Sequence, residues 1–534
     1  MLALSLQVAA GLQGTQSRQF ALRRAAATHG TPAATPEDLE VPLQRQVFCN
    51  RALNMDKMQA VGFDMDYTLA EYKVDFDLLA FDGAIRKLRQ LGYPEEIESF
   101  TYDADKYQRG LMIDKRRGNL VKLDRHKYAK VAYHGLTEIP SAERKAIYAQ
   151  SYEQQPQFNP PDYASIDTEF LKVDVCLFSQ LVDLKDRQGL PRATYAEVYK
   201  DVRNAVDLCH CDGEIKGPVA QNPARYIKPS PDLPGMLQQL KQDGKQVFLL
   251  TNSLYDYTEV VCTFLLGADW LDYFDLVIVG ARKPGFLLDP YLPLFQIRTE
   301  DGSLENVEMG SPQGAANALA KGKVFQGGNW NHLHRMLQLR TGSDLMYVGD
   351  HMYSDILRSK RTLGWRTVLM VPELESEVIE LGKMEEGQRR AQELRQARMH
   401  VDQQLRRAGL RYLALGHGVS DEQLEKLKAE REKLSRQQSE LSKRITEAVS
   451  ANHHSVHSDW GQLFKAGHQN SRWAQQVQEY ACLYTSHVTN FLFLNANLRV
   501  LEDLMPHDRM ILDESDPCLI QMSLDAGDED ESRL

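Results

Sequence analysis

Cysteine is scarce and dispersed in this sequence, with seven residues spread over 534 positions. Cysteines this few and this widely spaced make a poor disulfide framework, and they fit a chain that folds in a reducing compartment. The closest pair, Cys209 and Cys211 around His210, is too tight for a zinc site, in which paired ligands usually skip two or more residues. The cysteines therefore favour neither a disulfide scaffold nor a zinc centre.

Long apolar runs and an excess of basic residues are also missing. No apolar run is long enough to span a bilayer. The net charge is −11, whereas nucleic-acid-binding domains carry an excess of basic residues. We therefore expect neither nucleic acid nor a membrane as a partner. At 534 residues the chain is too long for one compact core, which predicts two domains or one core with large insertions.

Acidic residues are absent from residues 1–36, which hold Arg18, Arg23 and Arg24 and are rich in Ala, Ser, Thr and Gln. This composition is typical of an organelle transit peptide. A disordered cytosolic extension is an equally good interpretation. The expected location is therefore the cytoplasm, or a chloroplast or mitochondrion if the segment is a transit peptide.

Four short apolar runs predict buried strands, at residues 60–63, 247–250, 276–279 and 345–348. Runs of this kind suit a parallel sheet covered on both faces, and helical patterns lie between them. We therefore expect an α/β fold with a doubly wound parallel sheet. In such sheets, ligands bind at the carboxyl ends of the strands.

Polar residues follow each predicted strand at its carboxyl end. In chain order they are Asp64 and Asp66; Thr251, Asn252 and Ser253; Lys283; and Asp350 and Asp355. This convergence on one edge of the sheet is the strongest indication of function in the sequence.

The polar residues together suit phosphoryl chemistry. Asp64 can act as a nucleophile that forms an aspartyl-phosphate, and Asp66 as a general acid and base. A phosphate dianion repels a carboxylate, so a cation is needed, and oxygen ligands such as Asp350 suit Mg²⁺. Asp355 would hold metal-bound waters. Lys283 would neutralise phosphate charge, and Thr251 and Asn252 would bind phosphate oxygens.

About 180 residues separate the first two predicted strands, too many for one crossover. Residues 74–231 are therefore expected to form an inserted cap, and residues 42–73, 232–375 and 451–507 the catalytic core.

Residues 376–450 carry leucines seven apart, which predicts a helical hairpin with its turn at 409–419. This hairpin either packs on its own domain or forms a subunit contact. Residues 508–534 form an acidic tail.

The motifs DMDYT, TNS, KP and GDHMYSD, in this order, resemble those of the haloacid dehalogenase superfamily. Longer segments are similar to the cytosolic purine 5′-nucleotidase family. These are 48–73, 199–210, 247–258, 275–284, 347–367 and 461–492. The likeness runs from about residue 42 to 507. It implies a Rossmann-like haloacid dehalogenase core.

The resemblance also implies a reaction, namely Mg²⁺-dependent hydrolysis of nucleoside 5′-monophosphates, chiefly purine ones, through an aspartyl-phosphate. Asp64 matches the nucleophile and a metal ligand. Asp66 matches the acid/base residue, whose backbone carbonyl also binds Mg²⁺, and Asp350 matches the remaining ligand. Asp355 matches the carboxylate behind the metal. The phosphate-binding positions are filled by Thr251, Asn252, Ser253 and Lys283.

In the cap, the resemblance places Arg203, Asp207, His210 and Lys216 on the nucleoside and Phe170 against the base. Arg203 and Asp207 stand four apart on a predicted helix, so a simple ion pair between them is the alternative. Asp167 replaces an amide near the family's effector site, which leaves nucleotide activation and base preference open.

Several functional alternatives also stay open. The intermediate could pass to a second nucleoside, which would make the enzyme a phosphotransferase. The substrate could instead be a sugar phosphate, or the chain a non-catalytic scaffold. The sequence does not decide whether the chain forms a homo-oligomer.

Overall fold

The computed structural model describes residues 42–51, 53–148, 158–309, 312–414, 421–467, 469–493 and 497–498. The predicted transit peptide or extension, residues 1–36, and the predicted acidic tail, residues 508–534, lie outside the described residues. Within the described residues, no helix combines the length and the apolar character that a membrane span requires.

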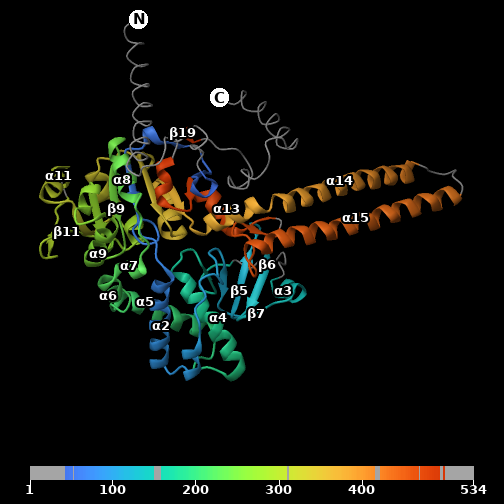
Figure 1. Ribbon diagram of the computed structural model, residues 1–534, viewed down its shortest axis with the longest axis horizontal. Helices are drawn as coiled ribbons and strands as arrows, with labels where there is room; N and C mark the ends of the chain where they lie inside the picture. The colour runs from blue at the N-terminus through green and yellow to red at the C-terminus, as the bar shows by residue number, and fades with distance from the viewer. Residues whose placement is uncertain are drawn as a thin grey trace, which may run out of the picture.

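A ten-stranded sheet forms the centre of the molecule (Figure 1), in the order β1-β18-β15-β14-β3-β9-β10-β13-β11-β12. The middle strands, from β18 to β13, pair in parallel. They are β18 (Leu483–Thr485), β15 (Arg366–Met370), β14 (Leu345–Gly349), β3 (Ala60–Phe63), β9 (Gln246–Leu250), β10 (Leu276–Val279) and β13 (Val324–Gly327). The four predicted strands are β3, β9, β10 and β14, so the predicted doubly wound parallel sheet is confirmed.

Antiparallel strands extend both edges of the sheet. They are β1 (Phe48–Cys49) beside β18, and β11 (Leu294–Ile297) and β12 (Leu304–Asn306) beyond β13. Two smaller pairs lie elsewhere, β2 (Leu53–Asn54) with β19 (Asn497–Leu498), and β16 (Lys465–Ala466) with β17 (Gln469–Asn470).

The direction of chain growth reverses at β3. From β3 the chain adds β9, β10 and β13 on one side, and then returns to add β14, β15 and β18 on the other. In open α/β sheets, the crevice beyond the carboxyl end of such a switch strand is the usual ligand site. The topology therefore directs attention to the residues that follow β3.

Both faces of the sheet are covered, which explains why its central strands β3 and β10 are apolar along their whole length. Val61, Phe63 and Leu249 pack in one cluster with residues of α8 (Leu233–Gln242) and α9 (Tyr255–Leu266). Ala60 and Phe248 face the opposite way. They pack with residues of α10 (Gly285–Leu288), α11 (Pro312–Lys321) and α12 (Trp330–Met336).

A second body lies beside the core and is built from residues between β3 and α8 (Figure 1). Its helices are α2 (Val74–Gln90), α3 (Ser141–Ile147), α4 (Leu171–Gln188), α5 (Tyr195–Cys211), α6 (Lys216–Gln221) and α7 (Pro223–Tyr226). Its antiparallel sheet has the order β7-β6-β5-β4-β8. These strands are β7 (Thr137–Glu138), β6 (Ala129–His134), β5 (Asn119–Leu123), β4 (Met112–Asp114) and β8 (Tyr163–Ser165).

The two connections between this body and the core run side by side. Lys73 N donates to the carbonyl of Tyr226 at 2.7 Å, and Lys228 N donates to the carbonyl of Glu71 at 2.8 Å. The insertion therefore leaves and re-enters the core at one place.

A long helical hairpin extends away from the rest of the molecule (Figure 1). It consists of α14 (Glu385–Ala414) and α15 (Asp421–Val456), joined to the sheet through α13 (Glu373–Lys383) and α16 (Arg472–Tyr480). Leu434 packs with Val401 and Ala408 in its seam. The prediction that the turn begins at residue 409 is wrong, since α14 continues through Gly409 to Ala414. One glycine costs a helix only about 1 kcal/mol, and Gly409 lies among strong helix formers.

Candidate active site

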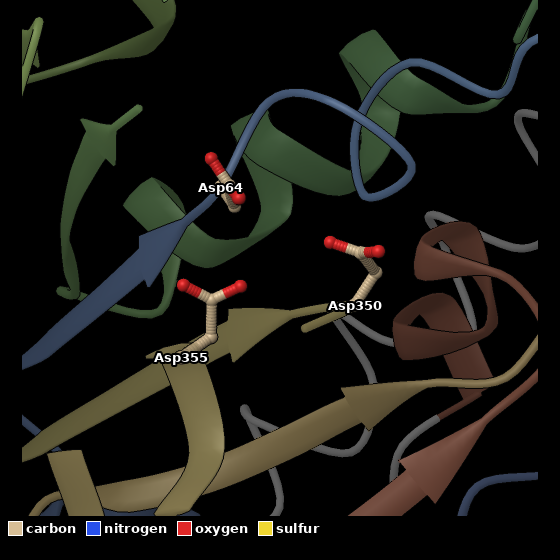
Figure 2. A group of neighbouring side chains, drawn as sticks. All are labelled: Asp64, Asp350 and Asp355. Carbon is tan, nitrogen blue, oxygen red and sulfur yellow. The ribbon is translucent and has the colours of Figure 1, made fainter. Parts of the chain in front are cut away.

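Three buried carboxylates meet beyond the carboxyl ends of β3 and β14 (Figure 2). Asp64 directly follows β3, Asp350 directly follows β14, and Asp355 lies on the helical segment Met352–Leu357. One oxygen from each of the three lies within 4.8 Å of the others. The backbone N–H of Asp64 donates to the carbonyl of Val348 at 2.9 Å, which extends the β3–β14 ladder to the carboxylate itself.

Lys283 reaches this cluster from the loop after β10. Its side chain is only 1% exposed, and its Nζ lies 2.9 Å from Asp64 Oδ2 and 2.8 Å from Asp355 Oδ1. It also donates to the hydroxyl of Tyr347 at 2.9 Å. Burial lowers the pKa of Lys283, but Asp355 and Asp64 outweigh it, so the pKa lies well above its usual value and the ammonium is charged.

The cluster is more acidic than one lysine can balance. The pKa of Asp64 is raised to about 7, because the effects of burial, Asp355 and Asp66 together outweigh that of Lys283, which lowers it. Burial also raises the pKa of Asp350, with Asp355 and Asp64 adding to the effect. Buried oxygen ligands with surplus negative charge suit a hard divalent cation such as Mg²⁺. The donor set therefore fits the metal that the sequence predicted.

Asp66 is held apart from this cluster by two hydroxyl groups. Tyr72 donates to Asp66 Oδ1 at 2.5 Å, and Ser253 donates to Oδ2 at 2.8 Å. The chain can present both carboxylates because it turns tightly after Asp64, with the N–H groups of residues 68, 69 and 70 all donating to the carbonyl of Met65. The loop thus gives its two acids different surroundings.

The residues expected to bind phosphate lie in the loop between β9 and α9. Thr251 is fully buried, and its hydroxyl accepts from the N–H of Ser253 at 3.1 Å. Asn252 Oδ1 accepts from the backbone N–H of Lys283 at 2.6 Å, which ties this loop to the one after β10. Thr251, Asn252, Ser253 and Lys283 are therefore neighbours around one edge of the sheet.

The insertion residues expected to bind the nucleoside form two groups. In the first, Arg203 Nη1 lies 2.9 Å from the buried carboxylate of Asp174, and its Nε donates to Asp207 at 3.1 Å. The ion pair with Asp207 is thus present, while contact of either residue with a nucleoside stays a prediction. Asp174 has no motif that identifies it in the sequence.

The second group is aromatic. Phe170 packs edge-on against His210, with ring centroids 5.3 Å apart, and against Tyr67 at 4.7 Å. Burial, Arg203 and Lys216 together lower the pKa of His210 to about 4 against the opposing effect of Asp207, so the imidazole is neutral at pH 7. The Nζ of Lys216 lies 5.2 Å from the ring centre of Tyr257, whose hydroxyl is 3.1 Å from that of Tyr72.

Tyr72, Thr168 and Arg109 also contact residues of the site, and no motif in the sequence identifies them. Tyr72 lies six positions after Asp66, at a spacing that carries no signal of its own. Thr168 donates to Asp350 Oδ2 at 2.7 Å, and Arg109 Nη1 donates to the Asp350 carbonyl at 3.1 Å, both from the insertion. The sequence alone does not show that this arginine is buried.

Replacing Gly349 with alanine is expected to lower the free energy of unfolding by about 1–3 kcal/mol. A Cβ at this position would lie 2.6 Å from both Cβ and Oδ2 of Asp355, so the carboxylate would have to move away from Lys283. Urea unfolding measures the effect. Gly382→Ala is the control, because its Cβ would meet nothing within 4 Å and alanine favours the helix α13. Equal stability of the two variants would contradict the tight fit.

Comparison with known proteins identifies relatives of this chain. Rat 5′-nucleotidase domain-containing protein 2 is 31% identical over 341 residues, which cover 62% of this chain and 60% of the rat protein. The human protein of the same name is 30% identical over 357 residues, covering 65% and 67%. The match therefore spans about two thirds or less of each relative's length.

Among solved structures, CbbY from Rhodobacter sphaeroides in complex with phosphate covers 59% of this chain and 86% of its own, at 15% identity and a TM-score of 0.21. The strand order establishes the fold. The model of the 5′ nucleotidase family matches residues 47–510. The resemblance to a 5′-nucleotidase family is thereby confirmed, and the chain belongs to the 5′ nucleotidase family.

Proposed function

We propose that this protein is a Mg²⁺-dependent 5′-nucleotidase that hydrolyses purine nucleoside 5′-monophosphates to nucleoside and phosphate. The observation that carries the proposal is the arrangement of two acids on one loop. Asp64 is paired with Lys283 in a buried cluster, and Asp66 is held separately by Tyr72 and Ser253. Family membership and the position at the switch strand support it.

In the first step, an Asp64 oxygen forms a bond to phosphorus as the bond between phosphorus and the 5′-oxygen breaks. Protonated Asp66 gives its proton to that oxygen, so the nucleoside leaves as a neutral alcohol. The ion pair with Lys283 favours the ionised, nucleophilic form of Asp64 against the effect of burial. Tyr72 and Ser253 fix the direction of the Asp66 carboxyl group.

In the second step, Asp66 takes a proton from water, whose oxygen attacks the phosphorus of the aspartyl-phosphate. The bond between phosphorus and Asp64 breaks, and inorganic phosphate leaves. A nucleoside hydroxyl in place of water would give phosphotransfer. Asp64, Asp350 and the backbone carbonyl of Asp66 would hold Mg²⁺, which supplies positive charge to the phosphoryl oxygens.

Phosphate release from a panel of IMP, GMP, AMP, CMP, UMP and sugar phosphates tests the proposal. We expect preference for IMP and GMP, loss of activity in EDTA and its return on addition of Mg²⁺. Activity on sugar phosphates alone would overturn the substrate assignment. An inactive protein, with Mg²⁺ and with or without ATP as an activator, would overturn the enzymatic function.

Replacing Asp207 with asparagine tests the contact with the base. The Asp207 side chain is 53% exposed, so this isosteric change should leave the fold intact. It removes a charged acceptor for the N1–H of hypoxanthine or guanine. A charged hydrogen bond contributes about 1.5–3 kcal/mol, so KM for IMP should rise about 10- to 100-fold. Hydrolysis of p-nitrophenyl phosphate should not change.

The matched control is Asp183→Asn, because Asp183 also forms an i,i+4 ion pair, with Arg187 on α4. Its KM for IMP should equal that of the wild type. An unchanged KM in Asp207→Asn would remove Asp207 from the base-binding site.

A further inference from the structure

A short segment of the insertion lies against the loop that follows β14. This strap, residues 166–169, connects β8 to α4. The carbonyl of Asp167 accepts from the N–H of Met352 at 3.2 Å, and its Oδ2 lies 3.5 Å from His351 Nδ1. Thr168 donates its hydroxyl to Asp350 Oδ2 at 2.7 Å. The strap therefore touches three consecutive residues of the loop, beginning with the buried carboxylate.

Arg109 holds the same loop from a second side. Its guanidinium is fully buried, and Nη1 donates to the carbonyls of Asp350 and Met370, both at 3.1 Å. Its Nε lies 3.1 Å from Glu169 Oε1 of the strap, and its Nη2 donates to Glu373 at 2.5 Å, at the start of α13. Arg109 thus joins the ends of β14 and β15 to the strap.

The antiparallel pairing of β4 with β8 explains why Arg109 and the strap lie together. Beyond the paired strands, Gly110 N donates to the carbonyl of Ile166 at 2.6 Å, and Ile166 N donates to the carbonyl of Leu111 at 2.9 Å. This pairing continues to the end that faces the core. Arg109 and Thr168 therefore belong to one structural unit of the insertion.

We infer that Thr168 and Arg109 are positioning residues for Asp350, so that the insertion must be seated for Asp350 to bind the metal of the proposed function. The Thr168 bond fixes the rotation of the carboxylate, and the Arg109 bond fixes the backbone that carries it. Polar partners of a metal-binding carboxylate typically change metal affinity 10- to 100-fold when removed. A merely structural contact between insertion and core would change stability but leave the affinity for metal unaltered.

Calorimetric titration of the nucleotide-free, full-length protein with MgCl₂ tests this inference without depending on turnover. Thr168→Val removes the hydroxyl at constant shape and should raise the dissociation constant for Mg²⁺ by about 10- to 100-fold. Thr168→Ser retains the hydroxyl and should bind Mg²⁺ nearly as the wild type does. Thr258→Val is the control, because Thr258 is also buried but its hydroxyl donates to the carbonyl of Leu254, at the start of α9.

Kinetics give the second readout. In Thr168→Val, the Mg²⁺ concentration for half-maximal activity should rise by the same factor, whereas kcat at saturating Mg²⁺ should recover and KM for IMP should stay unchanged. Wild-type Mg²⁺ affinity in Thr168→Val would overturn the inference. So would a fall in kcat that saturating Mg²⁺ does not restore.

The outcomes separate this inference from the proposed function. Nucleotide hydrolysis by the wild type with unaltered Mg²⁺ affinity in Thr168→Val would overturn only the positioning role. Weakened Mg²⁺ binding in Thr168→Val, in a protein that hydrolyses nothing in the panel, would overturn only the nucleotidase assignment. A wild type that binds no Mg²⁺ would overturn both.

Discussion

Replacing Asp64 with asparagine is expected to lower kcat by at least about 10⁴-fold, the scale seen when a covalent nucleophile is removed. The amide has nearly the shape of the carboxylate but cannot form the bond to phosphorus. The fold should survive, because the change removes one negative charge from a cluster that has too many, and Lys283 keeps its 2.8 Å contact with Asp355. Phosphate release and thermal melting of the purified variant measure the two effects.

The matched control for this change is Asp56→Asn. Asp56 is an exposed acid in a short helix that begins directly after β2, outside the carboxylate cluster, so its kcat should equal that of the wild type. Rapid quenching with phosphate-labelled IMP gives an independent readout, in which the wild type should carry acid-stable label and Asp64→Asn none. A kcat near the wild-type value in Asp64→Asn would exclude the aspartyl-phosphate mechanism.

The parallel sheet explains how much of the site could be predicted from the sequence. Asp64 and Asp350 follow apolar runs that are buried on both faces, and parallel strands bring their carboxyl ends to one edge whatever lies between them in the chain. Their proximity was therefore predictable although 285 residues lie between them in the chain. Lys283, placed after β10, was predictable for the same reason.

Contacts from the insertion could not be predicted in this way. Thr168 reaches Asp350 only because β4 pairs with β8, and that register depends on packing throughout the insertion. Tyr347 is a similar case. Within an apolar strand it looked like an ordinary core residue, but its hydroxyl accepts from Lys283 and donates to the Leu250 carbonyl. Periodicity indicates which side chains are buried, but not which polar atoms they meet.

The second large effect is expected for Lys283→Met, which should destabilise the metal-free protein by about 3–5 kcal/mol. The Lys283 side chain is 1% exposed and contacts both Asp64 and Asp355, so methionine leaves these buried carboxylates without their cation. Urea unfolding in EDTA measures the loss. Lys228→Met is the control, because Lys228 is half exposed and its pair with Glu71 should contribute no more than about 1 kcal/mol.

Activity should fall with stability in Lys283→Met, because the phosphoryl group loses the cation that neutralises it, but the two effects have different causes. Adding Asp355→Asn to Lys283→Met removes one of the unpaired charges and should recover part of the lost stability, since removing both partners of a buried pair is less harmful than removing one. The same double variant should stay inactive, because the cation is still missing. The stability change caused by Asp355→Asn in the wild type is the reference. If Asp355→Asn lowers stability by the same amount in the Lys283→Met variant, the two residues are not coupled, and the ion pair does not stabilise this site.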